Sequence, residues 1–474
     1  MKVLNKILIF FMLSLLAACS LAPKFQENKP TDMPQTFLND TIPYDSLRSD
    51  TVVNLRWWDI FKDTTLQSLI KTGLQNNKNV LTAAWRIEEA RAALGYTRAN
   101  SYPFLDIQAS AGRGNFSNMR LAQITNNFFI VPTLSWEIDI WGKYRSANQA
   151  AKAELLGSEA NLKAIQVELI SAISNTYFQL LDFNERLEIS KRTLATRDSA
   201  LKIMQMRYDK GVIPEIDLNQ AQIQRSIAAA AIPLYVRMIA YTQYGLSVLL
   251  GHYPEQIKTD KGILSLKPEL DIPSGMPASL LERRPDIIAA YQLAKAQNAR
   301  IGVAVAQRLP SINLTGAAGL ASADLATLTT SGLAWSVGGS LLSPIFNFNK
   351  NKRRVEIEKA RAKQTELQYE QTALTAFKEV ENALVEIQTG KEELQAYRQQ
   401  VKAAVNAERL AKMRYDRGVT SYLELLEAER NSFSAQLRLS EFTQTLLNAY
   451  VNLYKALGGG WISPEEEQNS SQGQ

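Results

Sequence analysis

The spacing of apolar and polar residues changes period several times along the chain. From 79 to 100 the apolar side chains recur at helical spacing, and after Pro103 they alternate with polar side chains in two stretches separated by a polar loop. For the first half of the chain, 57–251, this pattern predicts a helix, strands over 103–113 and 129–141, a long helix over 146–208 and a helix over 215–250.

The second half of the chain repeats the first at a constant offset of 207 residues. Segment 206–212 returns at 413–419 with Arg417 in place of Lys210, and paired glycines and prolines keep the same offset. This predicts a duplication without gaps and a second repeat over 286–458. The predicted elements of this half are strands over 310–320 and 331–342, a long helix over 353–415, a helix over 422–457, an inter-repeat equatorial linker over 252–285 and a C-terminal tail over 459–474.

The four predicted strands are about ten residues long, with one apolar and one polar face. In the first pair, for example, Ile130 and Leu134 alternate with Thr133 and Ser135. Such strands are typical of an outer-membrane barrel, although a soluble hairpin packed on a domain has the same pattern. Because four strands cannot close a barrel, a barrel requires several copies of the chain.

The predicted long helices are mostly polar and uninterrupted. No proline occurs in 133–213 or 345–463, so the helix over 146–208 would extend about 95 Å. Its apolar stripe is narrow, as in coiled coils, and Gly211 and Gly418 stand where a helix would end in a left-handed residue. The pattern therefore predicts antiparallel helical hairpins rather than a globular catalytic core.

Composition narrows the possible functions. The chain has 53 Lys and Arg residues against 47 Asp and Glu residues, without a basic block, which gives little support to nucleic-acid binding. With a single histidine, His252, and a single cysteine, Cys19, a histidine pair or triad, a cysteine-rich zinc site and an intrachain disulfide are excluded within one chain, and a histidine-dependent hydrolase or a zinc enzyme gains little support. We therefore expect no enzymatic activity, no catalytic residue, no metal and no cofactor, and interpret His252 as a surface or helix-cap residue.

The N-terminus has the features of a lipoprotein signal peptide over 1–18. Lys2 and Lys6 precede an apolar run that is too short to span a bilayer as a helix and that ends directly before Cys19. Cleavage there would leave Cys19 carrying acyl chains such as palmitate, followed by a polar lead over 19–56. The alternative is an ordinary cleavage site with an incidental cysteine.

Several segments resemble the outer-membrane factors of tripartite efflux systems, the TolC-like proteins, and especially their lipoprotein branch of NodT type. The strongest similarity covers 281–286 and continues to 309–312. Further similarities lie at Trp57-Trp58, 136–142 and 343–346, so that the resemblance extends from about 57 to about 461.

This resemblance implies an α+β membrane protein that forms a homotrimer. Four strands per chain would close a 12-stranded outer-membrane β-barrel, continuous with a long periplasmic α-helical coiled-coil barrel and lipid-anchored at Cys19 in the outer membrane of a Gram-negative bacterium. The implied function is a passive, gated exit duct that exports drugs, metals or other small molecules. Its partners would be a periplasmic adaptor and an inner-membrane pump of RND type or similar.

The resemblance also implies a gate, or pore constriction, near the two helix turns. Glu424 and Glu427 lie three residues apart on one predicted helix face and match positions where relatives carry aspartates around the pore. A solvated helix face has the same spacing. Asp217, Tyr415 and Arg207 would take part in the polar contacts that hold the gate shut.

Two further assignments concern the turns themselves. Thr420 stands where some relatives carry a gate arginine, so we expect that particular bond to be missing. The turn residues are either contacts for the adaptor or solvated, and they are Asp209, Lys210, Gly211, Asp416, Arg417 and Gly418.

Two other classes of protein share some of these features. A periplasmic adaptor (membrane fusion protein) of the same systems is also lipid-anchored and rich in coiled coil, but it lacks the 207-residue duplication and the strand hairpins. A lipid-anchored periplasmic enzyme would need a nucleophile and base or a phosphate-binding loop, and the sequence has no such motif. The adaptor is therefore the main alternative, and detergent-resistant trimers would distinguish the channel from it.

Overall fold

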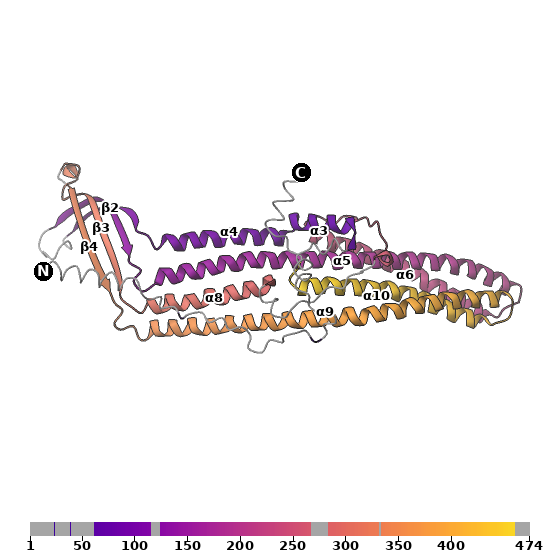
Figure 1. Cartoon of the computed structure of the whole chain (residues 1–474). Coiled ribbons are helices and arrows are strands. Elements are labelled where there is room, and N and C mark those ends of the chain that lie inside the picture. The colour runs from indigo at the N-terminus through magenta and orange to yellow at the C-terminus, as the bar shows by residue number, and fades with distance from the viewer. Residues whose placement is uncertain are drawn as a thin grey trace. The chain divides into compact units, whose positions relative to one another are not determined.

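The computed structural model of the chain describes Pro23, Leu38 and the ranges 61–114, 124–266, 283–330 and 333–459. The chain divides into two compact units (Figure 1). The first is made of 1–31, 85–159 and 289–371, and the second of 32–84, 160–288 and 372–474. Each unit therefore takes segments from both halves of the sequence.

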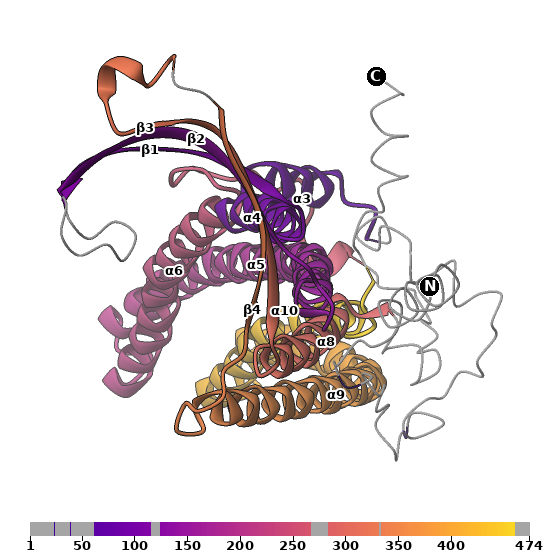
Figure 2. The same ribbon diagram turned by 90° about the vertical axis from the view of Figure 1, so that its left-hand side faces the viewer.

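The first unit contains one antiparallel sheet with the strand order β1-β2-β3-β4. Its strands are β1 (Phe104–Gly114), β2 (Thr125–Glu137), β3 (Ser311–Ser322) and β4 (Leu333–Leu342). Figure 2 shows that the sheet is bent rather than flat. Among the described residues, β1 and β4 each have one side without a neighbouring strand.

The strand register gathers apolar side chains on one face of this sheet, as the alternation predicts. Leu105 lies opposite Leu134, and Leu134 lies opposite Gly316. Much of this face is open to solvent in a single chain, since the exposed fraction reaches 72% for Trp335 and 82% for Val337. The large apolar side chains of the face are Leu105, Ile107, Ile130, Leu134, Leu314, Leu320, Leu333, Trp335, Val337 and Leu341.

The predicted bounds of β2 are wrong by four residues, because the strand covers 125–137 rather than 129–141. At its start, residues 125–127 pair with β1 although they are polar. The sequence analysis assigned them to a loop because it relied on their polarity. At its end, the Asp139 carboxylate accepts hydrogen bonds from the backbone N–H groups of Tyr144 (3.1 Å) and Arg145 (2.8 Å). These bonds satisfy free N–H groups at the start of the next helix.

The other elements are helices. The two long helices begin three residues earlier and end one residue later than the predicted ranges, and α9 and α10 follow α5 and α6 at an offset of 207 residues. The helices are α3 (Thr64–Asn76), α4 (Lys78–Ala99), α5 (Lys143–Asp209), α6 (Glu215–Leu249), α8 (Pro285–Ala306), α9 (Lys350–Asp416) and α10 (Tyr422–Ala456), with short 3-10 turns η2 (Ile263–Ser265) and η3 (Leu325–Thr327).

Helix α3 in the second unit is not anticipated by the sequence pattern. Its N-cap is Asp63, whose Oδ1 accepts hydrogen bonds from the backbone N–H groups of Thr65 (2.9 Å) and Leu66 (3.2 Å). The Tyr177 hydroxyl of α5 donates to the other carboxylate oxygen at 2.9 Å. The cap thus ties α3 to a core whose largest buried side chains include Ile70, Ile173, Tyr177, Phe178, Leu246 and Tyr454.

Several sequence-based assignments fall outside the described residues, among them the signal peptide, Cys19 and Trp57-Trp58. Within the described ranges, no helix combines the length and apolar character that a membrane crossing needs. His252 follows the end of α6, and its ring lies within hydrogen-bond distance of Asn76 (3.4 Å) and Glu255 (3.2 Å), as expected of a residue near a helix end.

Candidate functional site at the helix turns

In the second unit, α5 from residue 160 onward forms one hairpin with α6, and α9 from residue 372 onward forms the other with α10. The first turn contains Gly211 at φ +67° and the second contains Gly418 at φ +69°. In the first turn the backbone N–H of Val212 donates to the Arg207 carbonyl (2.9 Å) and that of Gly211 to the Tyr208 carbonyl (2.8 Å). The same pair of bonds recurs in the second turn. Both helices therefore end in a Schellman motif, which favours glycine at the left-handed position.

Close to the turns, apolar side chains join the two hairpins. They come from all four helices, so this group, here called the turn cluster, is buried only when the hairpins lie together. The turn cluster consists of Met204, Leu218, Ala221, Ala411, Tyr422, Leu425 and Leu426.

The structure brings together two of the predicted gate residues, Arg207 and Tyr415. The guanidinium of Arg207 on α5 lies over the Tyr415 ring of α9, 5.2 Å from its centroid. The Tyr415 hydroxyl donates to the sulfur of Met204 at 3.2 Å, and its ring centroid lies 5.5 Å from that of Tyr422. Tyr415 thus connects the first hairpin to the turn cluster.

Asp217, the third residue assigned to the closing contacts, lies half-buried in the first turn of α6. Among the described contacts, its carboxylate makes no hydrogen bond or ion pair with Arg207 or Tyr415. Its negative charge nevertheless acts on Tyr422 of the turn cluster. The pKa of Tyr422 is raised by burial first, and then by the charges of Glu429, Tyr415 and Asp217.

Glu424 and Glu427 both lie exposed on α10. The Glu424 carboxylate pairs with the Arg414 guanidinium of α9 at 3.0 Å and accepts a hydrogen bond from the Thr420 hydroxyl. Among the described residues, Glu427 has partners only on its own helix, with Arg430 at 3.5 Å and the Asn431 amide at 3.3 Å. The two carboxylates therefore share a solvent-facing side of the helix within one chain, and Glu424 is the more strongly held.

Arg414 is a contact residue that the sequence analysis missed. It occupies the position in the second half that Arg207 occupies in the first, at the offset of 207 residues. Arg207 contacts Tyr415, whereas Arg414 pairs with Glu424. Comparing the two halves residue by residue could have identified it.

The six turn residues, Asp209 to Gly211 and Asp416 to Gly418, are all exposed. One side-chain contact involves Asp209, which accepts a hydrogen bond from the Gln205 amide at 2.9 Å. Both interpretations of the turns, solvated residues and a docking surface, are compatible with this exposure.

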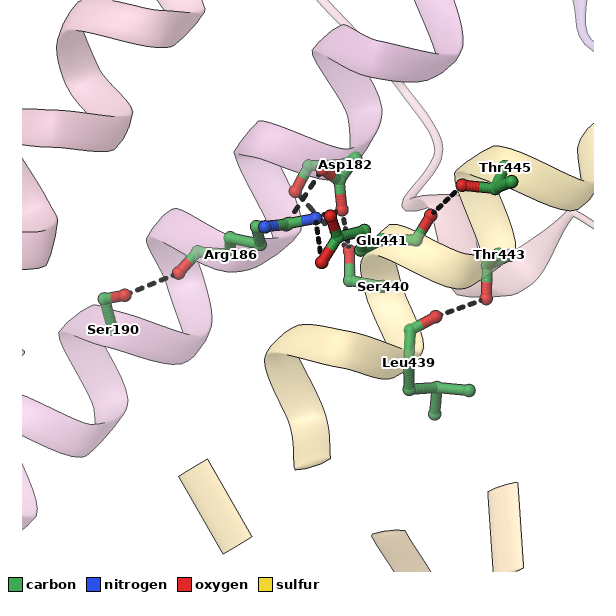
Figure 3. A network of polar contacts seen from close by, with 8 residues as sticks. All are labelled: Asp182, Arg186, Ser190, Leu439, Ser440, Glu441, Thr443 and Thr445. Atoms are coloured by element: carbon green, nitrogen blue, oxygen red, sulfur yellow. Dashed lines mark hydrogen bonds and ion pairs between the residues drawn. The ribbon is translucent and has the colours of Figure 1, made fainter. Parts of the chain in front are cut away.

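Farther from the turns, a buried polar network between α5 and α10 was also missed. Asp182 and Ser440 are 2% and 0% exposed, and the Ser440 hydroxyl donates to Asp182 at 2.6 Å. Arg186 pairs with Asp182 at 2.8 Å and with Glu441 at 3.3 Å. Figure 3 shows Asp182 and Arg186 on one helix facing Ser440 and Glu441 on the other. The signal in the sequence is an acid and a base four residues apart, next to an apolar run.

Burial and pairing act in opposite directions on this network. Burial raises the pKa of the Asp182 carboxyl, and the hydrogen bonds from Arg186 and Ser440 oppose that rise. Burial lowers the pKa of the Arg186 guanidinium, but the hydrogen bond and charge of Asp182 outweigh this effect and raise it overall. The network is therefore a paired, buried connection between the two hairpins.

Comparison with known proteins covers nearly the whole chain. The family model described as outer membrane efflux protein matches residues 69–252 and again 276–459. The toluene efflux pump outer membrane protein TtgC of Pseudomonas putida is 32% identical over 466 residues, which cover 96% of this chain and 95% of that protein. The probable outer membrane lipoprotein SilC of Salmonella typhimurium is 30% identical, over 96% of this chain and 99% of that protein.

Solved structures with the same fold are outer-membrane channels. The channel OprN is 28% identical with a TM-score of 0.86, over 94% of this chain and 100% of that one. The Campylobacter jejuni channel CmeC is 27% identical with a TM-score of 0.87, over 96% of this chain and 98% of that one. These similarities support an outer-membrane channel component and not a periplasmic adaptor. The chain belongs to the outer membrane efflux protein family: it is an outer-membrane component of an efflux system, and the chain itself extends into the periplasm.

Proposed function

We propose that this chain forms a homotrimeric exit duct, a passive and gated channel for small molecules rather than an enzyme. Three copies would contribute four strands each to a 12-stranded barrel, and their helices would form the periplasmic tube. A periplasmic adaptor and an inner-membrane pump would supply the cargo and the energy. The constant offset between the two halves supports an origin by duplication.

The observation that carries this proposal is the isolated sheet of the first unit. It has one apolar face that is open to solvent in a single chain, and two edge strands, β1 and β4, each of which has one side without a neighbouring strand among the described residues. Exposed edges and a continuous apolar face are unfavourable in water. Pairing β1 of one copy with β4 of the next would remove the edges and turn the apolar face toward lipid.

A second observation supports assembly through the helices of the second unit. Helix α6 carries exposed apolar side chains at seven-residue intervals, with Ile227, Leu234, Tyr241 and Val248 in one row. This spacing is that of a coiled-coil seam. A helix of a second copy would cover the seam.

The gate would lie at the helix turns. In a trimer, Glu424 and Glu427 would form two rings of three carboxylates that favour cations over anions. The contacts of Arg207 and Tyr415, together with the charge of Asp217, would hold the hairpins in the closed arrangement. The exposed residues Asp209 to Gly211 and Asp416 to Gly418 are the proposed contact surface for the adaptor.

Lipid at Cys19 would anchor the mature chain, and the relative SilC is likewise described as a probable outer membrane lipoprotein. The apolar run before Cys19 supports this proposal. The mass of the mature N-terminal peptide tests it, because Cys19→Ser would lose the mass of the acyl chains.

Single-channel conductance of the purified protein in planar bilayers tests the proposed function. We expect a small, cation-selective conductance from a trimer, and a loss of cation selectivity in Glu424→Gln/Glu427→Gln. The matched control is Glu392→Gln/Glu393→Gln, which removes the same charge from exposed positions on α9. A protein that stays monomeric in detergent and gives no pore would contradict the proposal. Equal loss of selectivity in both double variants would contradict only the assignment of the gate.

A further inference from the structure

Between the Asp182 network and the turn cluster lies a second buried group of charges that nothing above accounts for. Arg197 on α5 is 4% exposed and Glu429 on α10 is 9% exposed. The Arg197 guanidinium donates to the Gln224 carbonyl of α6 at 2.6 Å and lies 5.1 Å from the Phe433 ring of α10. Arg197 therefore contacts its own hairpin by a hydrogen bond and the other hairpin by ring stacking.

The charges of this group are not fully paired. The second terminal nitrogen of Arg197, Nη2, is buried without a hydrogen-bond partner in the described part of the chain. No ion pair within 4.0 Å joins Arg197 to Glu429. Each buried charge nevertheless acts on the other, because burial raises the pKa of Glu429 while the charge of Arg197 opposes that rise. Two other charged groups of α9 act on Glu429, namely Glu408 and Lys412.

A cavity lies beside the pair. It has a volume of about 220 Å³, and Arg197 and Glu429 both line it, together with Thr193 and Thr196 of α5 and Glu408 of α9. A polar cavity of this size has room for water. The two hairpins are therefore in contact here without dry, close packing.

We propose that Arg197 and Glu429 form a breakable layer between the hairpins, which sets how easily the α5–α6 hairpin separates from the α9–α10 hairpin at the turns. Separation would hydrate two charges that are now buried without a direct bond, so this layer opens at low cost. Separation at the Asp182 network would break several direct bonds, so the hairpins stay together there. The pair is a positioning element for the gate, and its role in gating rests on the proposed channel function.

Substitutions of Arg197 and Glu429 should have coupled effects on the separation of the hairpins. Arg197→Gln and Glu429→Gln each remove one desolvated charge together with its attraction to the other charge, so their effects on the separation of the hairpins should not add. The double variant loses that attraction once, whereas the two single effects count it twice. We expect the fraction of time spent in a larger conductance state to be about tenfold lower in the double variant than the two single effects combined would give.

The control is Arg192→Gln, which alters the same cavity from outside the pair. The Arg192 side chain is 67% exposed and pairs with Glu185 of its own helix at 3.8 Å. It should leave the conductance unchanged. Where Arg197→Gln fails to assemble, Arg197→Lys keeps the charge and removes the planar contact with Phe433, and it should show a smaller effect than Glu429→Gln.

Hydrogen–deuterium exchange of the α5 segment 187–209 gives a readout that needs no channel activity. Exchange in the double variant should be slower than the two single-variant effects combined would give. Additive effects in the double variant, or an equal effect of Arg192→Gln, would overturn the breakable layer while leaving the channel proposal intact. A wild-type protein that stays monomeric in detergent and gives no pore, but shows this coupled exchange, would instead refute the channel and retain the layer.

Discussion

The two polar layers between α5 and α10 use similar residues in different ways. In the Asp182 network, a buried acid, a buried hydroxyl and a base whose side chain is 14% exposed make direct bonds of 2.6–2.8 Å. In the Arg197–Glu429 layer, a buried acid and a buried base stay beyond ion-pair distance beside a cavity of about 220 Å³. The first layer has its charges satisfied, and the second has a buried guanidinium nitrogen without a partner.

The difference shows that burial of charge alone does not fix two helices together. Desolvation costs each charge several kcal/mol in either layer, and only direct bonds offset that cost. A layer with those bonds resists separation, whereas a layer without them gains hydration when it opens. The layer without direct bonds is also the one that lies nearer the turns in sequence, where we propose that the hairpins separate.

The largest effect should come from breaking the paired layer. Asp182→Ala leaves Arg186 buried beside a largely exposed Glu441 and removes the acceptor of Ser440, so we expect a loss of about 3 kcal/mol in the free energy of unfolding. Unfolding followed by circular dichroism in detergent measures this loss. Glu441→Ala is the control, because its carboxylate is 60% exposed and its pair with Arg186 should contribute no more than about 1 kcal/mol. Equal losses in the two variants would contradict the distinction between the layers.

An intermediate effect should come from making the unpaired layer apolar. Arg197→Met with Glu429→Leu removes two desolvated charges that lack a direct bond, and we expect the free energy of unfolding to rise by about 1 kcal/mol. The same kind of change in the paired layer, Arg186→Met with Asp182→Leu, should not stabilise, because Ser440 would lose the carboxylate to which it donates. Stabilisation of both layers to the same extent would remove the contrast between them.

The sequence predicted the arrangement of elements better than the contacts between them. The strands and long helices follow from local periodicity, and the turns follow from Gly211 and Gly418, which need a left-handed conformation. Helix α3 was missed because its stability depends on the Asp63 cap and on Tyr177, a residue far away in the chain.

The candidate site was predictable only in part, for the same reason. The resemblance directed attention to Arg207 and Tyr415, which do meet, and to Glu424. The pairing of Glu424 with Arg414 joins two helices, and the contacts of Arg197 join three elements. Such contacts depend on which helix faces pack together, and a repeat of apolar spacing along one helix does not specify them.

The smallest of the three effects concerns pH. Burial raises the pKa of both Asp182 and Glu429. For Asp182, hydrogen bonds donated by Arg186 and Ser440 oppose the rise. For Glu429, Arg197 and Lys412 oppose it only by their charge, and the charge of Glu408 adds to it. A carboxyl whose folded pKa is raised binds its proton more tightly in the folded state than in the unfolded chain. Stability is therefore gained as the pH falls, and it is lost as the pH rises from the ordinary range of a carboxyl, about 4, through the raised pKa.

Glu429→Gln removes this titration, so its unfolding midpoint should fall less than that of wild type as the pH rises from about 4 to about 7. The same comparison for Asp182→Asn should give a smaller difference in slope, because direct hydrogen bonds already favour the charged form of Asp182. Thermal unfolding at matched ionic strength measures both slopes, and Glu392→Gln controls for the general loss of a carboxylate. If Asp182→Asn changed the slope more than Glu429→Gln, the direct bonds of the paired layer would not be what distinguishes it from the breakable one.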